Sequence, residues 1–404
     1  MLAMKILWIK AGGIVPLDSG GKIRSYHILR QLSQRHDVTF FTFYAGASEG
    51  LHSDVRDVLK KVICVPLKLP SSRTIRGVAH YIAHCFSPLP YSMAKYCCSE
   101  VSRALSDVII SNRYDLWVCD FVYPAPIIPW DVQVPKVLFA HNVEAQVWER
   151  YHRITPNPLW RWVSWREYQA MAKAERRYIS KADHLLTVSE LDRKFFSRYF
   201  DPSRITVIPT GVDTDYFRPL PGDERPNHLV FTGSLDWLPN DDGASYLLKN
   251  VLPRIRSEIP EATLCIAGRN PSSDLRALGR RYGVEVIGWV EDIRSCVREA
   301  AVYVVPLRVG GGTRLKIFEA MAMGKPIVST TIGAEGLPVT DGENIILQDD
   351  SSEFAAAVVR LLRDPVARGR IGRAARKTVE ESFTWKASAD EFDSALRKAL
   401  IPNA

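Results

Sequence analysis

Short apolar runs alternate with helical patterns along the first half of the chain. The runs predict strands and read AMKILWI (3–9), DVTFFTF (37–43), KVICVPL (61–67), YDLWVCD (114–120), PKVLFAH (135–141), HLLTVS (184–189) and RITVIP (204–209). Helical patterns separate them, including one over about 21–34 and a long one that ends near residue 182. This alternation is typical of a parallel sheet covered by helices.

A polar segment rich in proline and glycine interrupts the alternation at residues 210–227 and predicts a linker. The strand pattern then restarts as HLVFTG (228–233), ATLCIAG (262–268), VEVIG (284–288), AVYVVPL (301–307), PIVST (326–330) and NIILQ (344–348). We therefore expect an α/β chain of two doubly wound, Rossmann-like domains that face each other across a cleft.

The expected domains are residues 1–210 and residues 211–384, and a C-terminal helix over about 385–404 is expected to pack back on the first domain. A chain of 404 residues is long enough for two separate cores.

The composition indicates a globular protein, with 46% hydrophobic and 24% charged residues. No run approaches the roughly 18 consecutive apolar residues that a membrane-spanning helix needs. The start of the chain lacks the features of a signal peptide, so we expect a cytoplasmic protein. The seven cysteines are scattered without a CxxC pair, which indicates neither a zinc site nor a disulfide framework.

The positive charge is concentrated in the first domain. Residues 1–209 hold 28 Lys and Arg against 18 Asp and Glu, whereas the remainder holds 25 against 27. A basic first domain favours an anionic partner there, such as lipid headgroups, a phosphate-bearing acceptor or nucleic acid, although a solvated basic surface can also serve solubility alone.

A glycine-rich turn stands between a predicted strand and a predicted helix in PLRVGGGTRLKIFEAMAMGKPIVST (306–330). Leu315, Phe318 and Met321 recur at helical spacing and are expected to be buried. The turn of Gly310, Gly311 and Gly312 presents backbone N–H groups at a helix start, where phosphates bind.

Charged residues around this turn match the parts of a nucleoside diphosphate. Arg308, Arg314 and Lys316 would bind the diphosphate, and Glu319 would accept hydrogen bonds from ribose hydroxyls. A glycine turn followed by a solvated basic helix is the alternative. Arg314 and Lys316, the two cations after the turn, together with Glu319 favour a binding site.

The stretch GGGTRLKIFEAMAMGKPIVSTTIGAEGL resembles the donor-nucleotide motif of family 4 retaining glycosyltransferases, which have the GT-B fold. PTGVDTDYF, FTGSLDWLPNDDGASYLL and FTWKASADEFDSAL extend the resemblance over nearly the whole chain. It implies transfer of a sugar from a nucleotide diphosphate sugar, a UDP- or GDP-sugar, to an unidentified lipid-linked, polysaccharide or other acceptor.

The chain departs from the family pattern at two places. Gly311 stands where many members have a first glutamate, and the loop from Gly233 to Asp236 lacks the family's Arg and Lys. Both departures occur together in a branch of the family with GSLDWLPN and GGGTRLK. We infer that the cations for the diphosphate have moved to the second motif.

The resemblance assigns further residues to the donor site and the acceptor site. Expected donor contacts outside the charged residues are Gly20, Gly21, Gly233, Ser234, Asp236, Asn240, Gly310, Gly311, Gly312 and Thr313. His141, at a predicted strand end, matches the active-site histidine that would contact the donor sugar. Asn142, Glu144 and Trp148 follow it and are expected near the acceptor.

A retaining transfer without a carboxylate nucleophile can use the leaving diphosphate to accept the acceptor's proton while fixed cations stabilise its charge. His141, Arg314, Lys316 and Glu319 are then the expected catalytic residues. No Asp-x-Asp pair is suited to a divalent ion, so we expect no metal and no other cofactor.

Tryptophan and arginine are interleaved in residues 146–183. This mixture is typical of a helix on a membrane interface or of aromatic rings stacked on sugars, and core packing is equally compatible. No nucleic-acid-binding motif accompanies it, so no nucleic acid is expected. Peripheral contact with an anionic membrane at the inner face of the plasma membrane is therefore one expectation.

Two other function classes remain open at the level of the sequence. Nucleotide-sugar 2-epimerases use the same fold and donors, and they would change the sugar without an acceptor. A non-catalytic nucleotide-sugar-binding protein would bind the donor without turnover.

Overall fold

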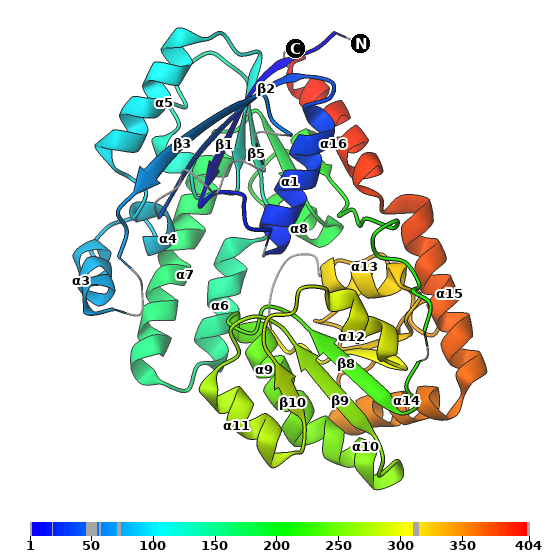
Figure 1. The fold of residues 1–404 in the computed structure, drawn as a ribbon. Coiled ribbons are helices and arrows are strands. Elements are labelled where there is room, and N and C mark those ends of the chain that lie inside the picture. Colours follow the sequence, from blue (N-terminus) through cyan, green and yellow to red (C-terminus); the bar gives the residue numbers. More distant parts are fainter. Residues whose placement is uncertain are drawn as a thin grey trace. The chain divides into compact units, whose positions relative to one another are not determined.

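The structure is a computed structural model that describes residues 2–17, 19–45, 55, 58–70, 74–222, 224–309 and 315–401. The chain forms two compact units (Figure 1). Unit 1 comprises Met1–Pro209 and Ser388–Ala404, and unit 2 comprises Thr210–Ala387.

Unit 1 is built on a seven-stranded parallel sheet with the order β3-β2-β1-β4-β5-β6-β7. The strands are β1 (Lys5–Ala11), β2 (Asp37–Ala45), β3 (Lys61–Leu67), β4 (Leu116–Asp120), β5 (Lys136–Phe139), β6 (His184–Thr187) and β7 (Ile205–Val207). Each overlaps one of the apolar runs, and the reversal of strand order between β1 and β4 is that of a Rossmann-like sheet.

Both faces of this sheet are covered, which explains why its strands are nearly continuous apolar runs. Ile6 and Trp8 of β1 belong to one buried cluster, and Leu7 and Ile9 belong to another. Side chains of a strand alternate between faces, so the two clusters are the cores on either side of the sheet.

The helices of unit 1 are α1 (Gly20–Leu32), α3 (Ile75–His84), α4 (Tyr91–Ala94), α5 (Ser99–Ser111), α6 (Glu144–Ile154), α7 (Pro158–Ile179), α8 (Glu190–Phe196) and most of α16 (Trp385–Ala399). The long helical region expected up to residue 182 contains two helices, α6 and α7. Pro158 occupies the first turn of α7, and the Asn157 side chain caps it by accepting hydrogen bonds from the N–H groups of Leu159 and Trp160.

Helix α16 completes the core on one face of the unit 1 sheet. Phe392 is fully buried, and its ring lies 5.2 Å from that of Trp8 and 5.1 Å from that of Phe139. Asp393 accepts a hydrogen bond at 3.1 Å from the His36 ring. The last residues of the chain therefore belong structurally to unit 1.

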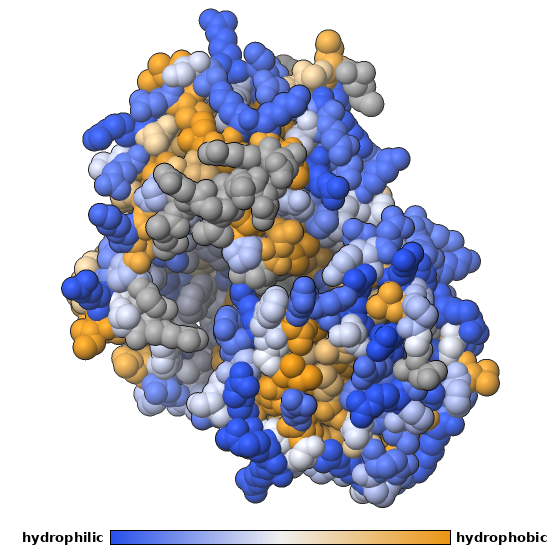
Figure 2. Space-filling model, viewed as in Figure 1, coloured by the Kyte–Doolittle hydropathy of each residue, from blue (hydrophilic) through white to orange (hydrophobic). Residues whose placement is uncertain are grey.

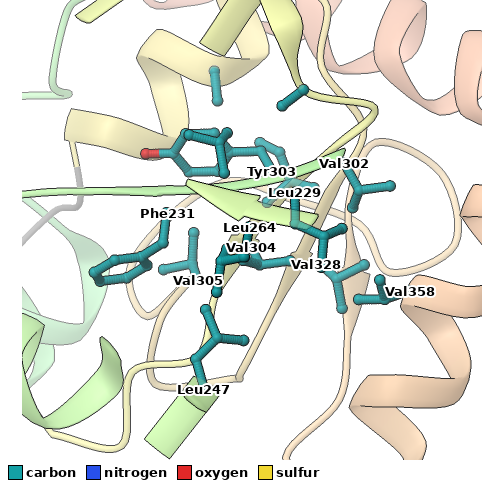
Figure 3. Packing of buried hydrophobic residues seen from close by; sticks show 14 of the residues in the cluster. Leu229, Phe231, Leu247, Leu264, Val302, Tyr303, Val304, Val305, Val328 and Val358 are labelled. Atoms are coloured by element: carbon teal, nitrogen blue, oxygen red, sulfur yellow. The ribbon is translucent and has the colours of Figure 1, made fainter. Parts of the chain in front are cut away.

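Unit 2 contains a six-stranded parallel sheet with the order β10-β9-β8-β11-β12-β13. Its strands are β8 (His228–Thr232), β9 (Thr263–Ala267), β10 (Glu285–Ile287), β11 (Val302–Val305), β12 (Ile327–Ser329) and β13 (Ile346–Leu347). Figure 3 shows Val304 and Val328 of this sheet packed with Leu247 and Val358 from helical segments.

The helices of unit 2 are α9 (Leu238–Tyr246), α10 (Leu252–Glu258), α11 (Ser273–Arg281), α12 (Ile293–Glu299), α13 (Leu315–Ala322), α14 (Ser351–Arg363) and α15 (Pro365–Ser382). Leu315, Phe318 and Met321 of α13 are buried, as their spacing predicts. Gly324 follows α13 with a φ of 68°, a left-handed conformation that ends helices and suits glycine.

Two sequence motifs far apart in the chain meet within unit 2. Val212 N–H donates to the Phe383 carbonyl at 2.8 Å, and Val212 also bridges to Thr384. A Cβ on Gly211 would lie 2.6 Å from the backbone nitrogen of Trp385. The PTGVD and FTW segments therefore require glycine at position 211 because the two backbones touch there.

Candidate functional site

Two glycines allow close backbone contacts at the carboxyl edge of the unit 2 sheet. Gly233 follows β8 and Gly268 follows β9, and a Cβ on Gly268 would lie 1.7 Å from the Gly233 carbonyl oxygen. A Cβ on Gly233 would lie 2.7 Å from the Asn240 amide nitrogen and 2.9 Å from Lys316 Nζ. Both positions need glycine because neighbouring groups fill the space of a side chain.

Lys316 lies at the start of α13 and reaches the end of β8. Its Nζ donates to the Thr232 carbonyl at 2.9 Å and to the Asn240 Oδ1 at 2.6 Å. The same ammonium lies 4.4 Å from the centre of the Phe231 ring. The structure thus brings Gly233, Asn240 and Lys316 together.

The Asn240 amide connects this group to the next turn. Its Nδ2 donates to the Ser234 carbonyl at 2.9 Å, so one side chain ties Lys316 to the Gly233–Ser234 loop. The loop follows β8, and the strand order of the sheet reverses between β8 and β11. Anionic ligands bind at such switch points, and Lys316 supplies a positive charge there.

Glu319 lies one turn further along α13. Burial raises the pKa of its carboxyl to about 7, although the charge of Lys316 acts against this. Within the described part of the chain, no group donates a hydrogen bond to this carboxylate. Glu319 therefore has acceptor capacity for the hydroxyl groups of a ligand.

Arg308 and Asp236, also expected at the donor site, have protein partners. Arg308 forms a two-point ion pair with Asp242, at 2.5 Å and 3.1 Å, and its guanidinium lies over the Tyr246 ring at 4.7 Å. Asp236 accepts from the Asn270 amide at 3.0 Å and lies 3.5 Å from Arg269. Arg308 would have to share or exchange Asp242 to bind a phosphate.

The central part of the glycine motif lies outside the described residues. It comprises the predicted donor residues Gly310, Gly311, Gly312 and Thr313 and the predicted catalytic residue Arg314.

Unit 1 holds a second group of polar residues at the switch point of its own sheet. Asp120 ends β4, and its Oδ2 accepts from the Trp8 indole at 2.9 Å and lies 3.1 Å from Lys10 Nζ. Its Oδ1 lies 2.7 Å from His141 Nε2. Burial alone would raise the pKa of Asp120, but Lys10 and His141 outweigh it and hold the pKa well below its ordinary value.

Arg24 completes this network from α1. Its Nη1 lies 3.0 Å from His141 Nδ1. A guanidinium can only donate, so Nδ1 of His141 accepts and Nε2–H donates to Asp120. Burial lowers the pKa of His141 to about 3, and Asp120 opposes this while Arg24 and Lys10 add to it, so the imidazole is neutral.

The Phe121 ring explains why the network needs a glycine at position 21. The Phe121 ring stacks on His141 with a centroid distance of 3.9 Å and an angle of 2°, and Phe121 has a φ of 65°. A Cβ on Gly21 would lie 2.5 Å from the tip of this ring. Gly20 and Gly21 begin α1, and Gly21 lets that helix approach the histidine.

Two of the residues expected near the acceptor, Asn142 and Glu144, are hydrogen-bonded to each other. Asn142 Nδ2 donates to Glu144 at 2.9 Å, and the Tyr123 hydroxyl donates to Glu144 at 2.7 Å. Glu144 is buried, and burial raises its pKa. Trp148 is half-buried and packs on the core of unit 1.

Four residues of the unit 1 network were missed by the sequence reasoning: Lys10, Arg24, Asp120 and Phe121. A signal existed for two of them, because Lys10 and Asp120 are charged residues at the ends of otherwise apolar strand runs. Arg24 and Phe121 carried no such signal.

In the ranges given above, no group of three or more His, Cys, Asp or Glu side chains is arranged to hold a metal ion. None of the helices in those ranges is both long and apolar enough to span a bilayer.

Comparisons with known proteins match both units. The family model described as Glycosyltransferase Family 4 matches residues 19–216, and the model described as Glycosyl transferases group 1 matches residues 226–364. The MMP alpha-(1->4)-mannosyltransferase of Mycolicibacterium hassiacum is 29% identical over 254 residues, covering 60% of this chain and 60% of that protein.

A glycogen synthase of Mycobacterium tuberculosis is 28% identical over 276 residues, 64% of this chain and 65% of that protein. The alignments to these two curated relatives thus span 60% and 65% of the relatives' length.

Solved structures match along nearly the whole chain. Sucrose-phosphate synthase from Thermosynechococcus elongatus has a TM-score of 0.74 at 18% identity, covering 98% of both chains. The Anabaena protein HepE, solved in complex with UDP and glucose, has a TM-score of 0.70 at 15% identity, covering 98% of this chain and 99% of that chain. At these identities the likeness concerns the fold.

Proposed function

The chain belongs to glycosyltransferase family 4 and has the GT-B fold, and from this premise we propose that it is a retaining glycosyltransferase that uses a nucleotide diphosphate sugar. The observation that carries the proposal is Lys316, which lies with Asn240 and Gly233 at the switch point of the unit 2 sheet, one turn from Glu319. The Lys316 cation and the tightly packed Gly233 loop fit a diphosphate, and the Glu319 carboxyl fits the hydroxyl groups of a ribose.

In this proposal unit 2 binds most of the donor nucleotide and unit 1 binds most of the acceptor. The diphosphate would contact Lys316 and the glycine motif, with Arg308 and Arg314 adding charge, and Glu319 would accept from the ribose. A UDP- or GDP-sugar is the proposed donor. HepE was solved with UDP, and a Corynebacterium glutamicum relative, 24% identical over 257 residues, is named a GDP-mannose-dependent mannosyltransferase.

The proposed chemistry retains the configuration at the anomeric carbon. The acceptor hydroxyl attacks this carbon from the side on which the diphosphate leaves. The bond from the carbon to the diphosphate oxygen breaks, and the bond to the acceptor oxygen forms. The proton of the hydroxyl passes to the departing diphosphate, whose charge Lys316 stabilises.

We further propose that His141 takes part in binding the donor sugar. Its neutral ring has one acceptor, Nδ1, which Arg24 occupies, so a sugar hydroxyl would replace Arg24 there. His184 is a suitable control because it is also buried in unit 1 but pairs with Thr206 at the start of β6. We expect His141→Ala to lower the transfer rate about a hundredfold or more, and His184→Ala to lower it far less.

Equal losses in the two histidine variants, measured with the same donor and acceptor, would show that His141 matters for folding rather than for transfer. A melting temperature for each variant separates the two explanations.

The acceptor is proposed to be lipid-linked or a polysaccharide, and the proposed place of action is the cytoplasmic side of the plasma membrane. The basic composition of residues 1–209 supports an anionic partner for unit 1.

Incubation with a panel of nucleotide sugars, with and without sugar and lipid-linked acceptors, tests the proposal. We expect nucleoside diphosphate release that depends on an acceptor, and a product whose anomeric proton coupling in NMR shows the donor's configuration. Conversion of the sugar without an acceptor would instead indicate an epimerase. An inverted product would contradict the retaining mechanism, and binding without turnover would indicate a non-catalytic protein.

A further inference from the structure

Helix α3 turns its apolar side to solvent. Ile75, Val78, Ile82 and Phe86 recur at helical spacing along α3 and just beyond it, and they are 90%, 54%, 56% and 91% exposed. Ala79 and Ala83, on the same side, are exposed as well. Figure 2 shows apolar residues at the surface where Figure 1 places α3. A surface helix ordinarily buries such a face.

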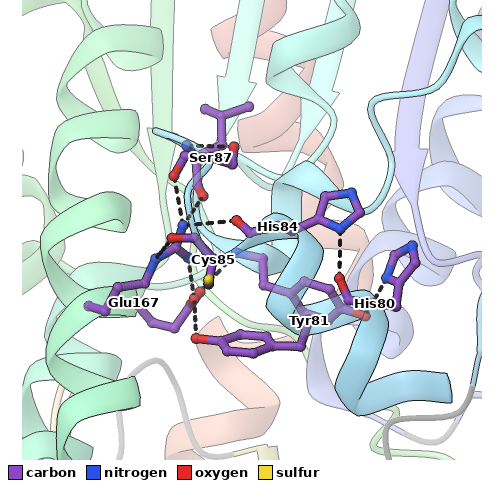
Figure 4. A network of polar contacts seen from close by, with 9 residues as sticks. His80, Tyr81, His84, Cys85, Ser87 and Glu167 are labelled. Carbon is purple, nitrogen blue, oxygen red and sulfur yellow. Dashed lines mark hydrogen bonds and ion pairs between the residues drawn. The ribbon is translucent and has the colours of Figure 1, made fainter. Parts of the chain in front are cut away.

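The opposite side of α3 is polar and packs against the protein (Figure 4). The Tyr81 hydroxyl donates to Glu167 of α7 at 3.1 Å, and the other Glu167 oxygen accepts from the Tyr91 backbone at 2.9 Å. His80 Nδ1 lies 3.0 Å from the Tyr91 hydroxyl. The buried carboxylate of Glu167 thus holds α3 and α4 at once.

Arg166 of α7 fixes the end of the same helix. Its guanidinium donates to the carbonyl groups of His84, Cys85, Ser87 and Leu89, at 3.2, 3.1, 2.7 and 3.1 Å. Arg166 thereby ties the end of α3 and the turn that follows it to α7. Rolling α3 to bury its apolar side would break these bonds, so the protein holds the apolar side outward.

The charge on and next to α3 favours an anionic partner. Arg76 of α3 and Lys68, which follows β3, are exposed, and residues 58–99 contain no Asp or Glu. Trp162, one turn before Arg166 on α7, is exposed together with Trp160 and Trp165. Exposed tryptophan, aliphatic side chains and cations together suit the interface of a bilayer with anionic lipids. A second copy of the chain would bring the same positive charges to the contact.

We propose that the apolar side of α3, formed by Ile75, Val78, Ile82 and Phe86, docks unit 1 on an anionic lipid bilayer. Arg166 and Glu167 hold α3 in the docking orientation, and Lys68 and Arg76 bind lipid headgroups. The proposal stands on the exposed face and its charge, and does not depend on the sugar or the acceptor.

Co-sedimentation of the full chain with vesicles tests this docking surface. The vesicles contain phosphatidylcholine alone or with about 30% phosphatidylglycerol. The test variant is Ile82→Ser with Phe86→Ser. The control variant is Ile110→Ser with Val366→Ser, which removes two side chains that are 83% and 79% exposed on α5 and α15. All four positions face solvent, so both variants should keep the wild-type melting temperature.

We expect the wild type and the control variant to bind the phosphatidylglycerol vesicles and the test variant to bind about tenfold or more weakly. Binding to phosphatidylcholine alone should be weak, and salt should reduce binding to the anionic vesicles. Equal binding by both variants overturns the proposal. Failure of the wild type to bind, with an oligomer in solution that the test variant dissociates, assigns the surface to a second copy instead.

Discussion

Glu319 is the residue at which stability and ligand binding are expected to conflict. Burial raises the pKa of its carboxyl to about 7 from an unfolded value near 4.5, so the folded chain holds an extra proton between these values. The free energy of unfolding therefore falls as the pH rises through this window. A charged Glu319 destabilises the empty protein but can accept hydrogen bonds from a ribose.

Replacing Glu319 by glutamine separates these two effects. We expect Glu319→Gln to melt higher than the wild type at about pH 8 and equally at about pH 4, because glutamine carries no charge to bury. Nucleoside diphosphate affinity should rise from about pH 6 to about pH 8 more steeply in the wild type than in the variant. The variant thereby controls for ionisation of the diphosphate itself. Parallel affinity profiles would remove Glu319 from the donor site.

At the scale of residues, the sequence suggests single positions but not their partners. Lys316 and Glu319 were proposed as site residues because their spacing from a glycine turn is visible along the chain, and their roles remain predictions. The pairing of Arg24 with His141 spans 117 positions, and no local pattern reports such a contact. The partners of Lys316 were likewise missed, since Thr232 contributes a backbone carbonyl that any residue has.

At the scale of elements, the loops after β8 and β9 touch each other at the carboxyl edge of the unit 2 sheet. A Cβ at Gly268 would meet the Gly233 carbonyl, whereas a Cβ at Gly288, after β10, would meet just the tip of Arg276 at 3.4 Å. We expect Gly268→Ala to lower the free energy of unfolding by about 1–3 kcal/mol and Gly288→Ala to have little effect. Chemical denaturation of both variants measures the free energy of unfolding. Similar losses in the two variants would contradict the close contact between Gly268 and the Gly233 carbonyl.

The strands were predictable because a parallel sheet buried on both faces requires long apolar runs. The break between α6 and α7 was missed because a helical pattern continues on both sides of Pro158. Helix α3 shows a further limit of pattern reading. Its apolar stripe is visible in the sequence, but the bonds from Arg166 and Glu167 that turn the stripe outward are not.

At the scale of the whole molecule, unit 1 depends on the end of the chain whereas unit 2 is a continuous segment. We expect truncation after Ala387 to remove the thermal transition of unit 1, because Phe392 no longer fills the core beside Trp8. The transition of unit 2 should remain. Scanning calorimetry measures both, with truncation after Ile401 as the control. Survival of both transitions in the shorter chain would contradict the assignment of α16 to the core of unit 1.

The central claim is that unit 2 binds a nucleoside diphosphate through Lys316. Isothermal titration of UDP and GDP into the wild type, Lys316→Ala and Lys325→Ala tests it most directly. Lys325 is a matched control because its Nζ also donates to two carbonyls of unit 2, those of Arg298 and Ala300, both at 2.7 Å. We expect one-to-one binding of at least one nucleotide, weakened about tenfold or more by Lys316→Ala and unchanged in Lys325→Ala. No binding of either nucleotide, or equal weakening by the two variants, would contradict the account.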